Sequence, residues 1–333
     1  MTHDNPLPDE ETRPPPILAT FVSDTSEPGI PAAPAPAADA TRPVAARPRI
    51  WPTVTVPILA IILSAILSTA AIVIAALVDA GPTTMSDSSL YWIWLEDFYT
   101  RPEGLFVISV PSQSLLLCAA LGAALLSPIP WQCRLGLARG ALPVWNWFAF
   151  AIATPMVGLV TWFIASHFLT DMGENLEVLN RIMGSFGGSR LPLVFLLIAL
   201  IPGVVEELLF RGYVQTRLLA RLPAGVAILI SSVLFAIAHM DPIHSLLVLP
   251  LGIWMGVVAW QAKSILPAML CHIVNNSVSI LGTQFNAPDT VDNHFTYTDW
   301  GILLACGPAM IVSVFLLTQA SVTAGPTTSE KLL

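Results

Sequence analysis

Ionisable and amide side chains are concentrated in one late block of an otherwise apolar chain. The block contains Glu206, Glu207, Arg211, His239, His272 and Asn276. Each lies in an apolar run, where a charged side chain at the centre of a membrane helix costs about 2.5–3.5 kcal/mol on insertion scales. By contrast, the apolar runs at 57–78, 105–126 and 301–318 contain no charged residue. Because intramembrane ionisable groups are functional by default, we predict a polar chamber inside the membrane where the chemistry takes place.

The two adjacent glutamates have different surroundings if their segment is helical. Glu207 and Arg211 are four residues apart, so they share one helix face and can form an ion pair. Glu206 points about 100° away from that pair. We therefore predict that Glu206 is the reactive carboxylate and that Glu207 and Arg211 support it. The alternative, an ion pair that only closes a helix bundle, suits Glu207 and Arg211 but fits Glu206 poorly.

Two histidines follow at positions that could bring them to the same chamber. A turn is expected at Pro223; Glu206 lies 17 residues before it and His239 lies 16 residues after it. If the helix continues to the turn, both residues lie about 25 Å from it, at the same depth on neighbouring helices. His272 and Asn276 are four residues apart and present an imidazole and an amide on one helix face. Taken alone, this second pair could equally make interhelical hydrogen bonds.

These groups could hydrolyse an amide bond in two ways. In the first, Glu206 is the general base for a water that His239 also holds. His272 and Asn276 then stabilise the oxyanion that forms when the water attacks a carbonyl. In the second, His239, His272 and Glu206, with an amide oxygen, ligate a zinc ion whose bound water is the nucleophile. The residues alone do not choose between the two mechanisms.

The rest of the chain is organised as a series of membrane-spanning helices. Of its 333 residues, 55% are hydrophobic and 11% are charged, which is typical of a polytopic membrane protein. Apolar runs of about spanning length occur at 57–78, 105–127, 147–169, 191–210, 224–239, 245–260, 264–282 and 300–319. Arginine or lysine flanks every second boundary, which predicts an all-α bundle of about eight transmembrane helices with both termini in the cytoplasm. The formal charge of −8 argues against a nucleic-acid partner.

Composition divides the chain into four parts. Residues 1–50 contain 11 of the 29 prolines and no apolar period, so we predict a disordered Pro/Ala-rich cytoplasmic tail. Residues 51–189 contain three N-terminal transmembrane helices, and residues 190–285 contain the polar block. Residues 286–333 contain the last transmembrane helix and a short C-terminal tail. The four cysteines show no CxxC spacing, which argues against a disulfide framework or a zinc ribbon.

Three motifs in the polar block are similar to those of a known family. They are EExxxR at 206–211, FxxxH at 235–239 and HxxxN at 272–276. On these motifs, residues 190–285 resemble the CAAX protease and bacteriocin-processing family (CPBP or Abi), whose members are similar to type II CAAX prenyl endopeptidases. The resemblance implies an intramembrane protease of the bacterial plasma membrane that acts on a membrane-associated peptide or protein.

The resemblance also implies a role for each motif residue. The implied catalytic residues are Glu206, Glu207, His239, His272 and Asn276, with Arg211 and Phe235 in support. Glu206 resembles the water-activating glutamate of the family, and His239 resembles its partner. His272 and Asn276 resemble a pair assigned either to an oxyanion hole or to metal ligation. The family is catalogued as metalloprotease, which implies zinc, although a metal-free, glutamate-dependent mechanism has also been argued for it.

Two other classes of function stay open on the sequence. Members of the resembled family are also suggested to be scaffold or bacteriocin-immunity proteins, which would use the same pocket to bind a partner without cleaving it. A transporter with a proton-relay glutamate would favour broken helices in both halves, and the charge-free first half argues against it. The substrate and the cleavage site are not specified by the sequence.

Overall fold

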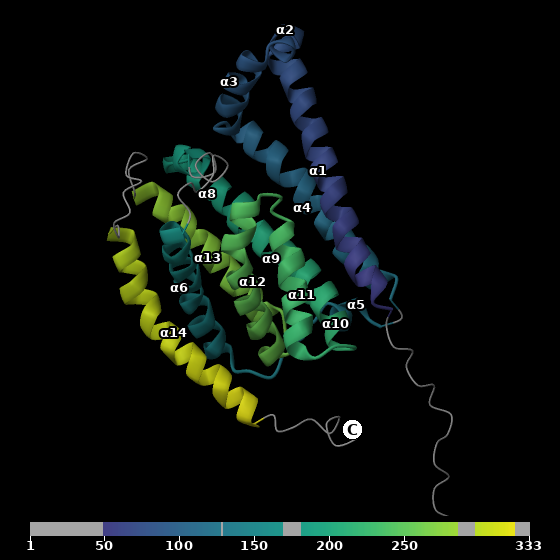
Figure 1. The fold of residues 1–333 in the computed structure, drawn as a ribbon, viewed down its shortest axis with the longest axis vertical. Helices are drawn as coiled ribbons and strands as arrows, with labels where there is room; N and C mark the ends of the chain where they lie inside the picture. The colour runs from purple at the N-terminus through teal and green to yellow at the C-terminus, as the bar shows by residue number, and fades with distance from the viewer. Residues whose placement is uncertain (1–48, 128, 169–180, 286–296, 324–333) are drawn as a thin grey trace, which may run out of the picture. The chain divides into compact units, whose positions relative to one another are not determined.

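The computed structural model describes residues 49–127, 129–168, 181–285 and 297–323, and every regular element in these ranges is helical (Figure 1). The long helices are α1 (Trp51–Asp79), α4 (Pro102–Leu125), α6 (Val144–Phe168), α12 (Pro242–Ala262), α13 (Leu266–Phe285) and α14 (Tyr297–Thr323). A helical run over Gly188–Leu219 and the shorter α11 (Ala224–Ile237) lie between α6 and α12 in the chain. The predicted all-α fold is confirmed. The tail predicted at 1–50 lies, as far as residue 48, outside the described residues, as does the C-terminal tail from residue 324.

Six helices of the described ranges are long and apolar enough to cross a membrane. They are α1, α4, α6, the run Gly188–Leu219, α12 and the segment Asp299–Ala320 of α14. The predicted count of eight is not confirmed. One of the two remaining apolar runs forms α11, whose 14 residues extend about 21 Å, short of the roughly 30 Å hydrocarbon core. The other forms α13, whose 20 residues are long enough but include a histidine and two asparagines.

The helical run that carries the two glutamates is not a uniform α-helix. It consists of η1 (Gly188–Arg190), α8 (Leu191–Val194), η2 (Phe195–Leu200), α9 (Ile201–Glu207), η3 (Leu208–Gln215) and α10 (Thr216–Leu219). Both η2 and η3 are π-helical, a geometry with hydrogen bonds between residues five apart that is frequent at functional sites. Glu206 and Glu207 therefore lie at the junction between α9 and η3.

The junctions around α11 place His239 outside a helix. The turn predicted at Pro223 is present, because Pro223 is the N-cap of α11. At the other end, α11 stops at Ile237, two residues before the end of the predicted run 224–239. Met240 then adopts a left-handed backbone with φ 54°, which a helix cannot continue through. Asp241 starts α12 by accepting a hydrogen bond from the backbone N–H of His244 at 2.6 Å.

The helices that carry the polar block pack directly on one another. α13 packs against α9, η2 and α12, while α11 packs against η3 and α12. α4 lies along α1 and also contacts α9 and η3, and α6 and α14 lie side by side (Figure 1). The shared core contains Leu209, Phe210, Phe235, Met255 and Met269. Three shorter helices were not predicted from the sequence: α2 (Gly81–Ser86), α3 (Ser88–Tyr99) and α5 (Trp131–Arg134).

A close contact between α9 and α13 requires a glycine at position 203. A Cβ atom at Gly203 would lie 2.6 Å from Cγ1 of Ile273 and 3.1 Å from the backbone nitrogen of the same residue. Replacement by alanine would overpack this contact, so we expect Gly203→Ala to lower the free energy of unfolding by about 1–3 kcal/mol. Thermal unfolding of the purified protein in detergent measures the change.

Gly122 provides the matched control, because it lies inside α4 and a Cβ there would meet no atom within 4 Å. Gly122→Ala should leave the stability unchanged or raise it by about 0.5–1 kcal/mol through helix propensity. Equal stability of the two variants would contradict the close contact between α9 and α13.

Candidate active site

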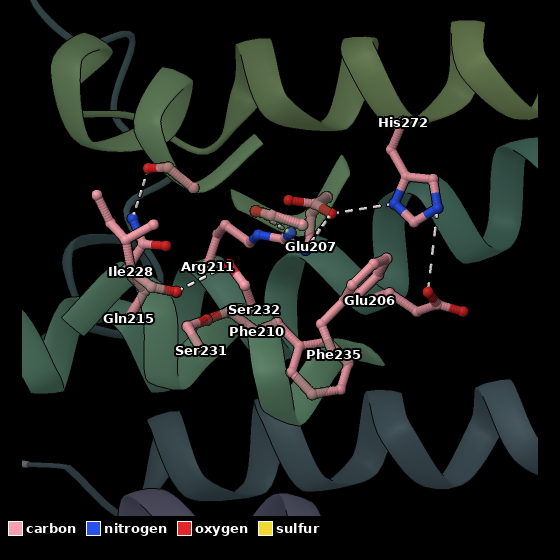
Figure 2. Close-up of polar contacts among 12 residues, drawn as sticks. Glu206, Glu207, Phe210, Arg211, Gln215, Ile228, Ser231, Ser232, Phe235 and His272 are labelled. Carbon is pink, nitrogen blue, oxygen red and sulfur yellow. Dashed lines mark hydrogen bonds and ion pairs between the residues drawn. The ribbon is translucent and has the colours of Figure 1, made fainter. Parts of the chain in front are cut away.

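A fully buried ion pair forms the centre of the site. The Glu207 and Arg211 side chains are both 0% exposed, and Arg211 Nη1 donates to Glu207 Oε1 at 2.7 Å (Figure 2). Arg211 Nη2 donates to the backbone carbonyl of Gly252 at 2.8 Å. The pair predicted from the four-residue spacing is therefore present, and it also joins η3 to α12. An arginine suits this position because its planar fork makes several directed hydrogen bonds from one charge.

His272 contacts both glutamates. Its Nδ1 lies 3.0 Å from Glu207 Oε1, and its Nε2 lies 4.0 Å from Glu206 Oε2 (Figure 2). The side chain is 6% exposed and reaches the glutamates from α13. Glu207 Oε2 is buried and has no hydrogen-bond partner among the residues that the structure describes. The two glutamates have different surroundings, since Glu207 is fully enclosed and Glu206 is 13% exposed, while their separate roles stay a prediction.

Glu206 is 13% exposed and has a partner that the sequence analysis did not identify. Its Oε1 accepts a hydrogen bond from Nε2 of Gln113 at 2.9 Å. Gln113 lies on α4, 93 positions earlier in the chain. One signal for it was present in the sequence: Gln113 is the amide side chain in a run from 105 to 126 that is otherwise apolar apart from serines.

His239 and Phe235 complete a cluster of rings beside the ion pair. Phe235 lies edge-on to both histidines, with centroids 5.1 Å from His239 and 5.7 Å from His272. The guanidinium of Arg211 lies over the same ring, 4.5 Å from its centroid. His239 Nδ1 lies 3.1 Å from the backbone carbonyl of Phe235, and its ring centroid is 4.6 Å from that of His244. These contacts of His239 do not include Glu206, so a shared depth for the two residues stays a prediction.

Asn276 joins α13 to η2. Its Nδ2 donates to the backbone carbonyl of Ile198 at 3.0 Å, and its Oδ1 accepts from Nδ2 of Asn275 at 3.3 Å. An interhelical hydrogen bond was the alternative reading of this residue, and the contact with Ile198 is of that kind. One N–H of the Asn276 amide is engaged with Ile198, which leaves the second as a donor for another oxygen.

The donors of the site do not form a ready metal centre as the side chains lie. In the described ranges, no group of three or more histidine, cysteine, aspartate or glutamate residues could hold a metal ion. His272 engages Nδ1 with Glu207 and His239 engages Nδ1 with the Phe235 carbonyl, which leaves Nε2 of each ring as the atom that could ligate a metal. Zinc ligation by His239, His272 and Glu206 is therefore left as a prediction.

Comparison with known proteins finds a family match in the polar block. Residues 188–278 of the 333 match the model of the family described as Type II CAAX prenyl endopeptidase Rce1-like. This part of the chain is similar to the Rce1-like family. The Rce1-like segment contains all three motifs and corresponds closely to the predicted range 190–285. No curated protein and no solved structure matches the chain.

The matched family is described as type II CAAX prenyl endopeptidase-like, and the apolar helices agree with an integral membrane protein. The match to the family model begins at residue 188, so α4 and Gln113 lie outside the Rce1-like segment. The geometry of the site therefore extends beyond the part of the chain that the comparison covers.

The burial of the ion pair predicts a large effect on stability. Arg211→Met would leave the Glu207 charge enclosed without its partner, so we expect the free energy of unfolding to fall by about 3–5 kcal/mol. The double variant Glu207→Gln/Arg211→Met removes both charges and should recover part of the loss. Thermal unfolding in detergent gives both values.

The surface pair Arg181–Glu96 is a matched control. Its atoms are 3.5 Å apart and both side chains are 60% exposed, so Arg181→Met should cost less than about 1 kcal/mol. A similar loss in Arg181→Met and Arg211→Met would show that burial of the central pair does not control stability.

Proposed function

We propose that this protein is an intramembrane endopeptidase that hydrolyses a peptide bond in a membrane-associated peptide or protein, with Glu206 as the general base. The observation that carries the proposal is the separation of 4.0 Å between Glu206 Oε2 and His272 Nε2. This distance is too long for a direct hydrogen bond, but it suits one water molecule held by both atoms. The partial exposure of Glu206 supports the same role, because a base must be reachable by its substrate.

Glu207 prepares His272 to hold this water. A carboxylate paired with Arg211 acts only as an acceptor, so a neutral His272 carries its proton on Nδ1 and donates to Glu207. The Nε2 of His272 is then an acceptor that faces Glu206. A water between them donates one hydrogen to Nε2 and the other to Glu206 Oε2. Its lone pair is left to face a substrate carbonyl.

The reaction follows from this arrangement in two steps. Glu206 takes a proton from the water as the water oxygen bonds to the carbonyl carbon of the substrate. The carbonyl oxygen becomes an oxyanion, for which we assign the second N–H of Asn276 as a donor. When the C–N bond breaks, the protonated Glu206 returns its proton to the leaving amine. The buried pair of Glu207 and Arg211 changes neither its protonation nor its position in these steps.

His239 is assigned as a partner in proton movement. A backbone carbonyl only accepts, so the contact with the Phe235 carbonyl places the proton of neutral His239 on Nδ1. Its Nε2 is then free to accept a proton or a hydrogen bond on the open side of the ring cluster. Phe235 fixes the ring between the ion pair and the turn that follows α11.

The substrate is proposed to come from the membrane. The family name refers to prenylated CAAX proteins, and a lipid-anchored C-terminus is one form of a membrane-associated peptide. Positively charged residues at alternate boundaries of the apolar runs support the orientation that we propose, with both termini in the cytoplasm.

Replacement of the proposed base tests the function directly. Glu206→Gln keeps the size of the side chain but cannot accept the proton, so we expect kcat to fall about 10²–10⁴-fold while the protein still folds and inserts. The measurement is cleavage of a fluorogenic farnesylated CAAX peptide by the full chain in liposomes. A cellular comparison of C-terminal and internal peptides, at matched expression, reports on other substrates.

Glu96→Gln serves as the control, because Glu96 is an exposed glutamate on α3. Normal cleavage by Glu206→Gln would rule out the proposed mechanism. If neither the wild type nor Glu206→Gln cleaves the peptide, no cellular peptide differs between them and the cellular phenotype is normal, a non-catalytic scaffold or immunity protein is favoured.

Removal of metal tests the competing mechanism. Because the proposed steps use only protein side chains and water, we expect activity to survive treatment with 1,10-phenanthroline or EDTA. Peptide cleavage before and after chelation, followed by addition of zinc, measures this. Loss of activity that zinc restores would instead favour ligation by His239, His272 and Glu206.

A further inference from the structure

Gln113 makes a hydrogen bond to Glu206 from outside the segment matched to the family. It lies in the middle of α4, whose residues from 105 to 125 include no charged side chain. Its Nε2 donates to Glu206 Oε1 at 2.9 Å. Because an ionised carboxylate offers only acceptors, the nitrogen of the amide must be the atom that faces it. The hydrogen bond therefore has a fixed direction, from α4 to the glutamate.

This bond determines which oxygen of Glu206 is available. Gln113 binds Oε1, and the other oxygen, Oε2, faces His272 Nε2 at a distance of 4.0 Å. A glutamate has three side-chain torsions, and the hydrogen bond at its tip restricts the last of them. Without it, the carboxylate could turn Oε2 away from the water that Glu206 and His272 are proposed to share. Misplacement of a reacting group by about 1 Å can cost about 10²-fold in rate.

The contacts of Gln113 suit a residue that orients Glu206 better than one that only holds two helices together. Its Oε1 is buried and has no hydrogen-bond partner among the described residues, so the side chain is satisfied only at the end that meets Glu206. It also borders a cavity of about 390 Å³ between α4 and the run that carries the glutamates. Apolar side chains such as Val110, Leu200 and Val204 line much of this cavity.

We propose that Gln113 is a positioning residue for Glu206, and that α4 is part of the active site. The amide holds the carboxylate in the orientation that aims Oε2 at the shared water. This inference rests on the proposed function, because it requires Glu206 to be the base. It assigns a role to a helix that the three motifs do not include.

The test compares variants that keep or remove the donor. Gln113→Met keeps an unbranched side chain of similar length but has no N–H and no unsatisfied carbonyl. We expect kcat for the farnesylated CAAX peptide to fall about 10–100-fold, KM to stay within about twofold, and the unfolding midpoint to stay at or above that of the wild type. Gln113→His keeps an N–H at a similar distance from the backbone and should recover most of kcat.

Ser112→Ala is the matched control on the same helix. The Ser112 hydroxyl bonds only to backbone carbonyls of its own helix, Ile108 at 3.3 Å and Ser109 at 3.0 Å, so its removal should leave kcat unchanged. If Gln113→Met yields no folded protein, Gln113→Asn provides the same test, because it keeps the amide but is one methylene too short to reach Glu206.

The outcomes separate this inference from the proposed function. Wild-type kcat in Gln113→Met, alongside an inactive Glu206→Gln, would overturn the role of Gln113 and leave the function intact. Parallel loss of stability and of kcat in Gln113→Met, without recovery in Gln113→His, would show that Gln113 is only a structural contact. Absence of cleavage by the wild type would count against the proposed function itself, and the inference would fall with it.

Discussion

Glu207 and Arg211 form an ion pair that solvent does not reach, and the neighbouring helices pack around this pair. Each charge is tolerable only while the other is present, because desolvation of an unpaired ion is expensive. Arg211 extends the pair to the Gly252 carbonyl on α12 and to the Phe235 ring on α11. Glu207 extends it to His272 on α13. The pair therefore ties together the elements that present the remaining polar groups.

A division of labour between two adjacent glutamates follows from the helix geometry. Glu207 faces inward, is fully enclosed, and orients an imidazole. Glu206, one position earlier, faces a different direction, toward α4, and keeps some exposure. The enclosed carboxylate thus sets the direction of the histidine, and the exposed one can react. A single glutamate could not occupy both positions, so the proposed mechanism uses both residues of the doublet.

The sequence predicted those parts of the site that depend on local spacing. The Glu207–Arg211 contact follows from a separation of four residues, and the turn at Pro223 follows from residues that disfavour a helix. Contacts between distant segments could not be predicted in this way. The Gln113 bond to Glu206 depends on how α4 packs on α9, and the π-helical stretches depend on packing as well. The end of α11 before His239 was missed because the apolar pattern continues past Ile237.

The short length of α11 bears on how water is kept out of, or admitted to, the hydrocarbon core. A helix of 14 residues cannot reach from one surface of a bilayer to the other, so if α11 starts at one surface, the bend at Met240 falls within the depth of the lipid tails. Backbone that leaves a helix at that depth is tolerated only where it is enclosed by protein or lines a hydrated cavity. The bend beside His239 would therefore have to be covered by protein or face water. Water is a reactant in hydrolysis, and a helix that ends within the hydrocarbon core could admit water there if its end faces a hydrated cavity.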